Sequence, residues 1–372
     1  MQGVSRLRLL ATVVVLVGLL GTACSSRSPS VVARPAAPRP TTTLAPTTTA
    51  TAGPPYPLTG LPMADPGVAA HPAVVVKMDN SPWARPQVGI NQADIVVELL
   101  VEGITRFALV YGSNTPTTVG PVRSARSSDI DLLAGLGRPL LAWSGANPTV
   151  TQQVTAAAAH GLLIDASRGA NPPQYWRDNT RQAPHNLFTS IPLLLSRFGA
   201  GDTNPPQAIL PIGSTGTPLP ATAAAVAGVT IDFGSGVVVS YAWDAKAAGW
   251  ARFQVDQLHD QAHSATLDSG GQQVAPPNLV VLFTPYGVSV ADPKSPQAES
   301  VGSGSGLVFV DGHQVAVNWS RPANTSPYRF TTADGAPYTL PPGRTWVALP
   351  AVGSAVTAMD APTAAGLLAL PR

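Results

Sequence analysis

The chain has 372 residues, and its 22 lysines and arginines against 20 aspartates and glutamates leave a net charge of only +2, which excludes bulk electrostatic attraction to nucleic acid. Its 39 prolines and 34 glycines exclude a helical bundle, whereas a hydrophobic content of 44% is ample for the packed cores of two domains. The only cysteine, Cys24, excludes an intrachain disulfide and a cysteine metal site.

Residues 1–24 are typical of a secretory signal peptide. Arg6 and Arg8 precede a short apolar run, which is too short to span a bilayer permanently. The small residues before Cys24 resemble the lipobox of bacterial lipoproteins, although leucine is more common where Gly21 stands. That resemblance implies a diacylglycerol anchor on Cys24 and a location on the extracytoplasmic face of the bacterial cell membrane. An ordinary secretory signal with an incidental cysteine is the alternative.

Residues 25–56 consist almost wholly of Ser, Thr, Ala and Pro. They contain too little apolar surface to fold, so we predict a disordered, extended tether between the anchor and the folded part. Whether its threonine runs are glycosylated stays open.

Residues 57–200 are predicted to form a domain that mixes helices with strands. The expected elements are strands at 73–79 and 138–145, a hairpin at 93–113 that turns at Glu102-Gly103, and helices at 148–161 and 190–199.

Residues 201–228 are predicted to be a linker, and residues 229–351 a mostly antiparallel β domain. Asp311-Gly312 and Asp334-Gly335 are typical two-residue hairpin turns. Residues 352–372 lack charge patterning and are predicted to form a loosely held tail. The expected fold class is therefore α+β, with a mixed α/β N-terminal domain followed by a mostly antiparallel β C-terminal domain.

Charge is concentrated in two stretches of the first domain, 77–131 and 168–185. Because planar guanidinium groups suit phosphate and carboxylate, we take these stretches as the source of the candidate site. The candidate ligand-binding residues are Arg85, Arg106, Arg123, Arg126, Trp143, Arg177, His185 and Asn186, with Trp143 as an apolar wall.

The loop that carries Arg123 and Arg126 is expected to enter a helix. Ser128 and Asp131 have the spacing of a capping box, which predicts a helix start at Ser128. Arginines before a helix N-terminus favour an anion site. Alternatively, the arginines pair with nearby acids, either those of the helix itself or Glu98 and Glu102, and fix the loop.

Other motifs indicate no metal and no cofactor. His259 and His263 have helical metal-pair spacing but lie in a β-hairpin context, where that spacing does not bring them together. The Gly-Ser repeat at 302–306 is predicted to be flexible and lacks the lysine of a phosphate loop. His185 is the best single candidate for proton transfer, with a structural histidine as the alternative.

The chain resembles the YerB-like bacterial lipoproteins, which have two adjoining domains of unknown function. The matching stretches are PLTGLP, ARPQVGINQADIVVE, VEGITRFALVY, VGPVRSARSSDIDLL, AWSGANPTV, YWRDNTRQAPHNLFTS, NLVVLFTPYG, GSGLVFVDG, NWSRP and PGRTWVAL. The resemblance implies a lipid-anchored extracytoplasmic protein with an α+β first domain and a β-rich second domain. It brings no established activity, but it places Arg123, Arg126, Arg177, Asp178, His185 and Asn186 inside family motifs.

Three functions follow as hypotheses. The first is a binding or scaffold lipoprotein of the cell envelope whose arginines bind an anionic cell-wall precursor or an envelope protein. The second is an enzyme acting on phosphorylated cell-wall or polyprenyl precursors, by a loose pattern similarity to the LytR-CpsA-Psr phosphotransferases. It would need Asp79, Asp94 or Asp129 free to hold a divalent cation. The third is a protein-docking module, which predicts an exposed apolar patch around Trp243, Trp250, Tyr286 or Trp319.

Overall fold

The computed structural model describes residues 53–63, 67, 70–170, 172–255 and 262–372. The predicted signal peptide, Cys24, most of the tether and His259 lie outside the described residues. Within the described ranges, no helix is both long and apolar enough to cross a membrane.

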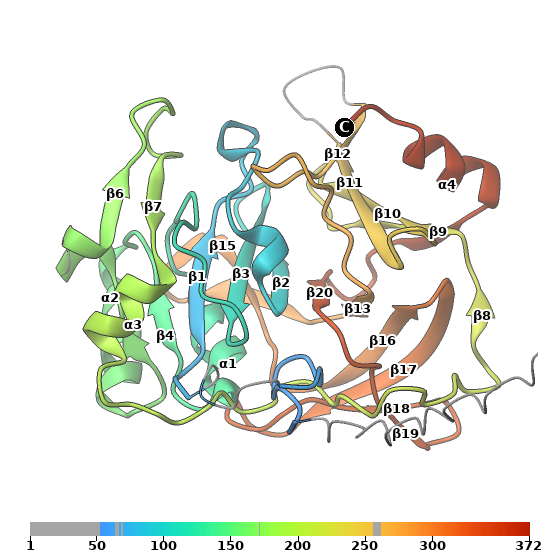
Figure 1. Cartoon of the computed structure of the whole chain (residues 1–372), viewed down its shortest axis with the longest axis horizontal. Coiled ribbons are helices and arrows are strands. Elements are labelled where there is room, and N and C mark those ends of the chain that lie inside the picture. The colour runs from blue at the N-terminus through green and yellow to red at the C-terminus, as the bar shows by residue number, and fades with distance from the viewer. Residues whose placement is uncertain (1–52, 64–66, 68–69, 171, 256–261) are drawn as a thin grey trace, which may run out of the picture. The chain divides into compact units, whose positions relative to one another are not determined.

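A twelve-stranded mixed sheet forms the centre of the fold (Figure 1). Its strands are β1 (Val74–Met78), β2 (Ile95–Leu100), β3 (Thr105–Tyr111), β4 (Leu140–Ala142), β5 (Ile164–Asp165), β8 (Ala224–Ala225), β13 (Asn278–Leu282), β16 (Gly302–Val310), β17 (His313–Arg321), β18 (Arg329–Thr331), β19 (Pro337–Tyr338) and β20 (Thr345–Leu349). The order is β19-β18-β17-β16-β13-β20-β2-β3-β1-β4-β5, with β8 also paired to β17.

Both predicted domains contribute to this sheet. β2 of the first segment pairs in parallel with β20 of the second, so the hydrogen-bonded ladder continues from one segment into the other. β1 also pairs in parallel with β4, whereas β1 with β3 and β2 with β3 are antiparallel. The domain limits predicted from the sequence stay predictions; the shared sheet is what the structure shows.

The sheet is buried on both faces, which explains its nearly continuous runs of valine and leucine. Val75 of β1 packs in one core with helices α1 (Ser128–Leu133) and α2 (Pro148–Ala159). Its neighbours Val74 and Val76 pack in a second core with helix α3 (Ile191–Phe198) and with a smaller sheet. Successive side chains of a strand point to opposite faces, so one strand supplies both cores.

The smaller sheet is antiparallel and has five strands in the order β12-β11-β10-β9-β21. They are β9 (Gly228–Asp232), β10 (Val238–Asp244), β11 (Gly249–Val255), β12 (His263–Ala265) and β21 (Val356–Met359). Helix α4 (Ala361–Leu368) packs beside β10 through Ala364. Two separate hairpins complete the fold, β6 (Tyr175–Arg177) with β7 (Leu187–Thr189) and β14 (Tyr286–Ser289) with β15 (Asp292–Ala298).

The predicted α+β fold class is confirmed, with helices and parallel strands in the first segment and antiparallel strands in the second. Helices α2 and α3 begin with the side-chain caps that their sequences predict. Asn147 accepts a hydrogen bond from the Val150 amide, and Ser190 accepts one from the Leu193 amide.

Three local predictions are wrong, because distant contacts override local pattern. The Ser128 hydroxyl accepts a hydrogen bond from the Ala298 amide at 2.9 Å, and α1 has no side-chain cap, so the capping box does not form. The predicted tail contains β21, which pairs with β9, and α4. The predicted flexible repeat lies in β16, where a Cβ at Gly304 would come within 2.7 Å of the Trp319 ring nitrogen.

The two sheets meet at a buried ion pair. Glu98 of β2 and Arg252 of β11 are both 0% exposed and lie 2.6 Å apart. The Thr105 hydroxyl and the indole N–H of Trp346 also donate to the Glu98 carboxylate, at 2.8 and 2.9 Å. Tyr241 of β10 donates to the same carboxylate at 3.3 Å. A buried charge with this many partners is stable only when all of them are in place.

Replacing Arg252 by methionine should lower the free energy of unfolding by about 3–5 kcal/mol, because the buried Glu98 carboxylate loses its cation. Urea unfolding of the full chain measures the loss. The double variant Glu98→Gln, Arg252→Met leaves no buried charge and should recover part of it. A loss below about 1 kcal/mol in the single variant would show that water or another cation replaces Arg252.

Candidate functional site

Charged side chains gather at the carboxyl end of β1, beside the parallel strand β4. This edge is where open sheets with parallel strands place their ligands. Lys77 of β1 is fully buried and binds Asp129 of α1 at 2.6 Å. Burial lowers the pKa of Lys77, while the nearby Asp129 carboxylate opposes that shift. This pair joins α1 to the sheet and brings the loop of Arg123 and Arg126 next to the end of β1.

Asp79, Arg123 and His185 form a group that we call the Asp79 cluster. One oxygen of the fully buried Asp79 carboxylate accepts from the Ser81 amide at 3.0 Å. The other lies 2.7 Å from His185 Nδ1 and 3.1 Å from Arg123 Nε. Among the described residues, His185 Nε2 and the two terminal nitrogens of Arg123 have no partner. Asp79 therefore fixes an imidazole and a guanidinium by their inner nitrogens and leaves their outer nitrogens available.

Arg126 binds Glu102 through two parallel hydrogen bonds of 2.8 and 2.6 Å. Ser295 of β15 donates a third hydrogen bond to the same carboxylate. Burial raises the pKa of Glu102, but the hydrogen bonds from Arg126 and Ser295 outweigh it and lower the pKa to about 2. The loop arginine is thus paired, as the structural alternative from the sequence expected.

Arg106 of β3 lies between these two groups and is only 5% exposed. Its nearest carboxylate oxygen, on Glu102, is 4.0 Å away. Its Nε and one terminal nitrogen have no hydrogen-bond partner in the part of the chain that the structure describes. Burial, followed by the charges of Arg126 and Arg123, lowers the pKa of Arg106 to about 10. Arg106, Arg123 and Arg126, the arginine cluster, therefore set three positive charges against the two carboxylates Asp79 and Glu102.

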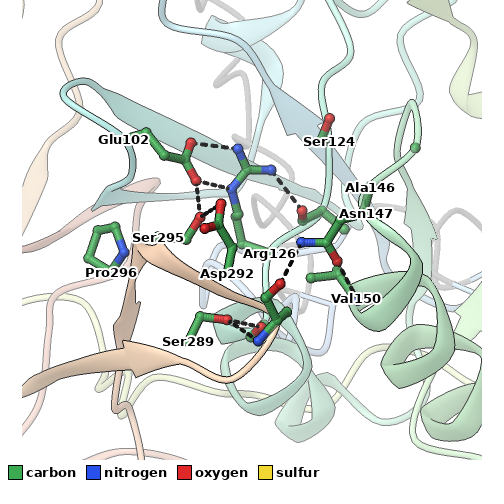
Figure 2. Close-up of a pocket in the computed structure, with 14 residues that line it drawn as sticks. Glu102, Ser124, Arg126, Ala146, Asn147, Val150, Ser289, Asp292, Ser295 and Pro296 are labelled. Atoms are coloured by element: carbon green, nitrogen blue, oxygen red, sulfur yellow. Dashed lines mark hydrogen bonds and ion pairs between the residues drawn. The ribbon is translucent and has the colours of Figure 1, made fainter.

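A cavity of about 470 Å³ opens beside Arg126 (Figure 2). Its wall is polar and comes from four segments that are distant in sequence. The polar lining residues are Glu102, Ser124, Arg126, Ser127, Asn147, Ser289, Asp292 and Ser295. Figure 2 shows the Arg126 guanidinium facing Glu102 on one side, with Asn147 at the start of α2 on the other. The hairpin β14–β15 forms one side of the cavity. A 2.8 Å contact between the Ser127 and Ser289 hydroxyls holds this hairpin against the loop of Arg126.

The structure brings together four of the eight predicted site residues, namely Arg106, Arg123, Arg126 and His185. Trp143 is 2% exposed, packs in the core and donates to Asp165 at 2.8 Å, so it is not a wall of the cavity. Arg177 donates to Asn186 at 2.5 Å, and Asn186 donates to two backbone carbonyls of the same hairpin.

Arg85 donates to the Asn80 carbonyl at 2.9 Å and lines a different hollow. Sequence reasoning missed the serines of β14–β15, because no local signal connects residues 289–295 with residue 102.

Within the described ranges, no group of three or more His, Asp or Glu side chains could hold a metal ion. The three aspartates that a cation-dependent enzyme would need are engaged by protein groups. Asp79 binds His185 and Arg123, Asp129 binds Lys77, and Asp94 accepts from Ser113 and from two backbone amides.

Two family models match two separate stretches of the chain. Residues 58–204 match the N-terminal domain, and residues 229–347 the C-terminal domain, of a family described as "Protein of unknown function (DUF3048)". The chain belongs to the DUF3048 family. This match, together with the similarity to YerB itself, confirms the resemblance to YerB-like lipoproteins that the sequence motifs indicated.

This DUF3048 protein is also similar in sequence and in structure to a bacterial relative. It is 29% identical to the putative lipoprotein YerB of Bacillus subtilis (strain 168) over 299 residues, which are 78% of this chain and 84% of that protein. It also superposes on the crystal structure of the YerB protein from Bacillus subtilis with a TM-score of 0.67 and 27% identity, covering 82% of this chain and 99% of that one.

The Glu102 carboxylate should make the stability of this DUF3048 protein depend on pH at the acid end. Its pKa is about 2 in the folded protein against an ordinary value of 4.5, so its contribution is complete above pH 4.5 and is lost as pH falls towards 2. Urea unfolding between these values should show a smaller loss of stability in Glu102→Gln than in the wild type. The exposed Glu299, changed to glutamine, is the control. Equal pH slopes in all three proteins would contradict the Arg126–Glu102 pairing.

Proposed function

We propose that this protein is a lipid-anchored, extracytoplasmic binding protein that holds an anionic ligand of the cell envelope at the arginine cluster. The family membership and the similarity to a putative lipoprotein support the anchor at Cys24. The tether of residues 25–56 would then let the folded part reach its ligand at a distance from the membrane.

The observation that carries the ligand proposal is the excess of positive charge around Arg106. A guanidinium that is 5% exposed, with two donor groups unsatisfied and two other arginines nearby, costs stability unless something compensates it. Natural proteins keep residues that lower stability in this way mainly at functional sites. Arg123 offers its outer nitrogens directly to an anion, and the charges of Arg106 and Arg126 add to the positive potential there. A phosphate or carboxylate group fits this chemistry.

Arg123→Met should weaken binding of inorganic pyrophosphate to the full chain by at least about tenfold, because it removes a charge-assisted contact. Isothermal titration calorimetry in detergent measures this. Arg197→Met, in the exposed last turn of α3, is the matched control and should bind as the wild type does.

Arg106→Met separates binding from folding. It should also weaken pyrophosphate binding, yet leave the melting temperature unchanged or raise it, because it removes a poorly satisfied buried charge. A large drop in melting temperature with unchanged binding would mean that the arginine cluster only holds the fold together.

The Asp79–His185 pair favours a second candidate, an enzyme acting on phosphorylated envelope precursors. A buried carboxylate on Nδ1 orients the imidazole and leaves Nε2 available for proton transfer. In hydrolysis of a phosphate ester, the water oxygen would bond to phosphorus as the ester P–O bond breaks. Protonated Nε2 would give its proton to the leaving oxygen, the attacking water would restore it, and Arg123 would bind the phosphoryl oxygens.

His185→Asn tests this candidate without disturbing the site, since the asparagine amide can replace Nδ1 as the donor to Asp79. Hydrolysis of p-nitrophenyl phosphate and of farnesyl pyrophosphate should fall by about 10²-fold or more, with pyrophosphate binding retained. His160→Asn, at the exposed end of α2, should be as active as the wild type. If the wild type hydrolyses neither substrate, the enzyme candidate fails and the binding function stands.

A further inference from the structure

A second hollow lies between the loop after β1 and the edge strand β12. It has a volume of about 300 Å³, and we call it the Trp83 groove. Its lining includes Trp83, Arg85 and Gln87 from that loop, Gln254 of β11, and Ser264 and Thr266 in and directly after β12. In Figure 1 the chain after β12 runs towards this loop, and the Ser269 amide donates to the Gln87 carbonyl at 2.9 Å. None of these residues belongs to the arginine cluster or to its cavity.

Trp83 is 62% exposed, although the backbone that carries it is firmly held. It lies in a short 3-10 helix, Pro82–Ala84, whose last residue is buried. Arg181 donates to the carbonyls of Ala84 and Pro86, at 2.9 and 3.0 Å, on either side of Arg85. An indole presented to solvent on a fixed loop loses little conformational entropy when it binds a ligand.

Each of the two glutamines that line the groove has one side-chain polar atom without a protein partner in the described ranges. Gln87 is 0% exposed; its amide nitrogen donates to the Asp79 carbonyl at 3.1 Å, and its Oε1 has no partner among the described residues. Gln254 is 4% exposed and accepts from Arg252 through Oε1 at 3.0 Å. The Gln254 amide nitrogen has no hydrogen-bond partner among the described residues. Buried amides with spare hydrogen-bonding capacity require a polar partner.

We propose that the Trp83 groove binds a glycan, with one sugar ring stacked on the Trp83 indole. A pyranose ring combines an apolar face of C–H groups with hydroxyls at its rim that both donate and accept. The indole matches the first feature, and the spare Gln87 acceptor and Gln254 donor match the second. Ser264 and Thr266 also line the groove, although the Thr266 hydroxyl already accepts from Arg252 at 2.7 Å and the Ser264 hydroxyl donates to the Gln254 carbonyl at 3.4 Å.

A proline-rich peptide fits the same groove less well. It would stack on Trp83 as such segments do in other aromatic-lined grooves. However, a proline has no N–H, so it offers nothing to the unused Gln87 acceptor. A sugar hydroxyl supplies that donor at every ring.

The full chain in detergent should bind at least one soluble tetrasaccharide among chitotetraose, cellotetraose and maltotetraose, with quenching of tryptophan fluorescence. Trp83→Ala should weaken this binding by at least about tenfold, the loss typical of a central aromatic contact. Trp176→Ala is the matched control, because Trp176 is 38% exposed on β6, away from the groove. Arg123→Met should bind the tetrasaccharide as the wild type does, which keeps this test separate from the anion site.

Three results would overturn the glycan assignment. One is no binding of any of the three tetrasaccharides by the folded wild type. Another is equal losses in Trp83→Ala and Trp176→Ala. The third is tighter, Trp83-dependent binding of a decaproline peptide that the tetrasaccharides do not displace, which would make the groove a peptide site.

Discussion

The buried pair of Glu98 and Arg252 is the contact on which the arrangement of the two sheets depends. Its charges are wholly removed from water, so it stabilises the fold only while Thr105, Tyr241 and Trp346 complete the shell around Glu98. Arg252 also lies over the rings of Phe107 and Trp346, at 5.3 and 5.0 Å from their centroids. Because these partners come from both sequence segments, the five-stranded sheet has one specified position on the central sheet.

The second segment also fixes the loop of the arginine cluster. Arg321 of β17 is fully buried and donates to the Asp131 carbonyl near the end of α1 at 2.7 Å. The Ala298 amide binds Ser128 at the start of the same helix, and Ser295 binds Glu102. A helix of only six residues has little stability of its own, so these contacts, with the Lys77–Asp129 pair, hold α1 and the arginines that precede it.

The sequence predicts what local pattern controls and misses what distant contacts control. Helices α2 and α3, the hairpin at Glu102-Gly103 and the turn at Asp311-Gly312 follow from caps and turn residues, and all are present. The crowding of Arg106, Arg123, Arg126 and His185 was predicted from their density, and Glu102 was named among the possible partners of the arginines. Asp79 was not predicted as the partner of Arg123 and His185. The local sequence around Ser128 predicts a helix cap. Its hydroxyl instead accepts a hydrogen bond from the amide of Ala298, which lies 170 residues away in the chain. Of the four aromatic residues around which a docking patch was expected, Trp250 and Trp319 are at most 2% exposed, and Trp243 and Tyr286 are half-buried.

Asp79 connects the two proposed surfaces. Its carboxylate holds Arg123 and His185 on the side of the arginine cluster, while its backbone carbonyl accepts from the Gln87 amide that borders the Trp83 groove. The residues from 79 to 87 form one short, tightly bonded segment, in which Ser81 binds Asp79 and Arg85 binds Asn80. Such a segment keeps the outer nitrogens of Arg123 and the Trp83 indole in a fixed relation. A polymer that combines sugars with phosphate would offer both of the groups that the two proposals assign to these surfaces.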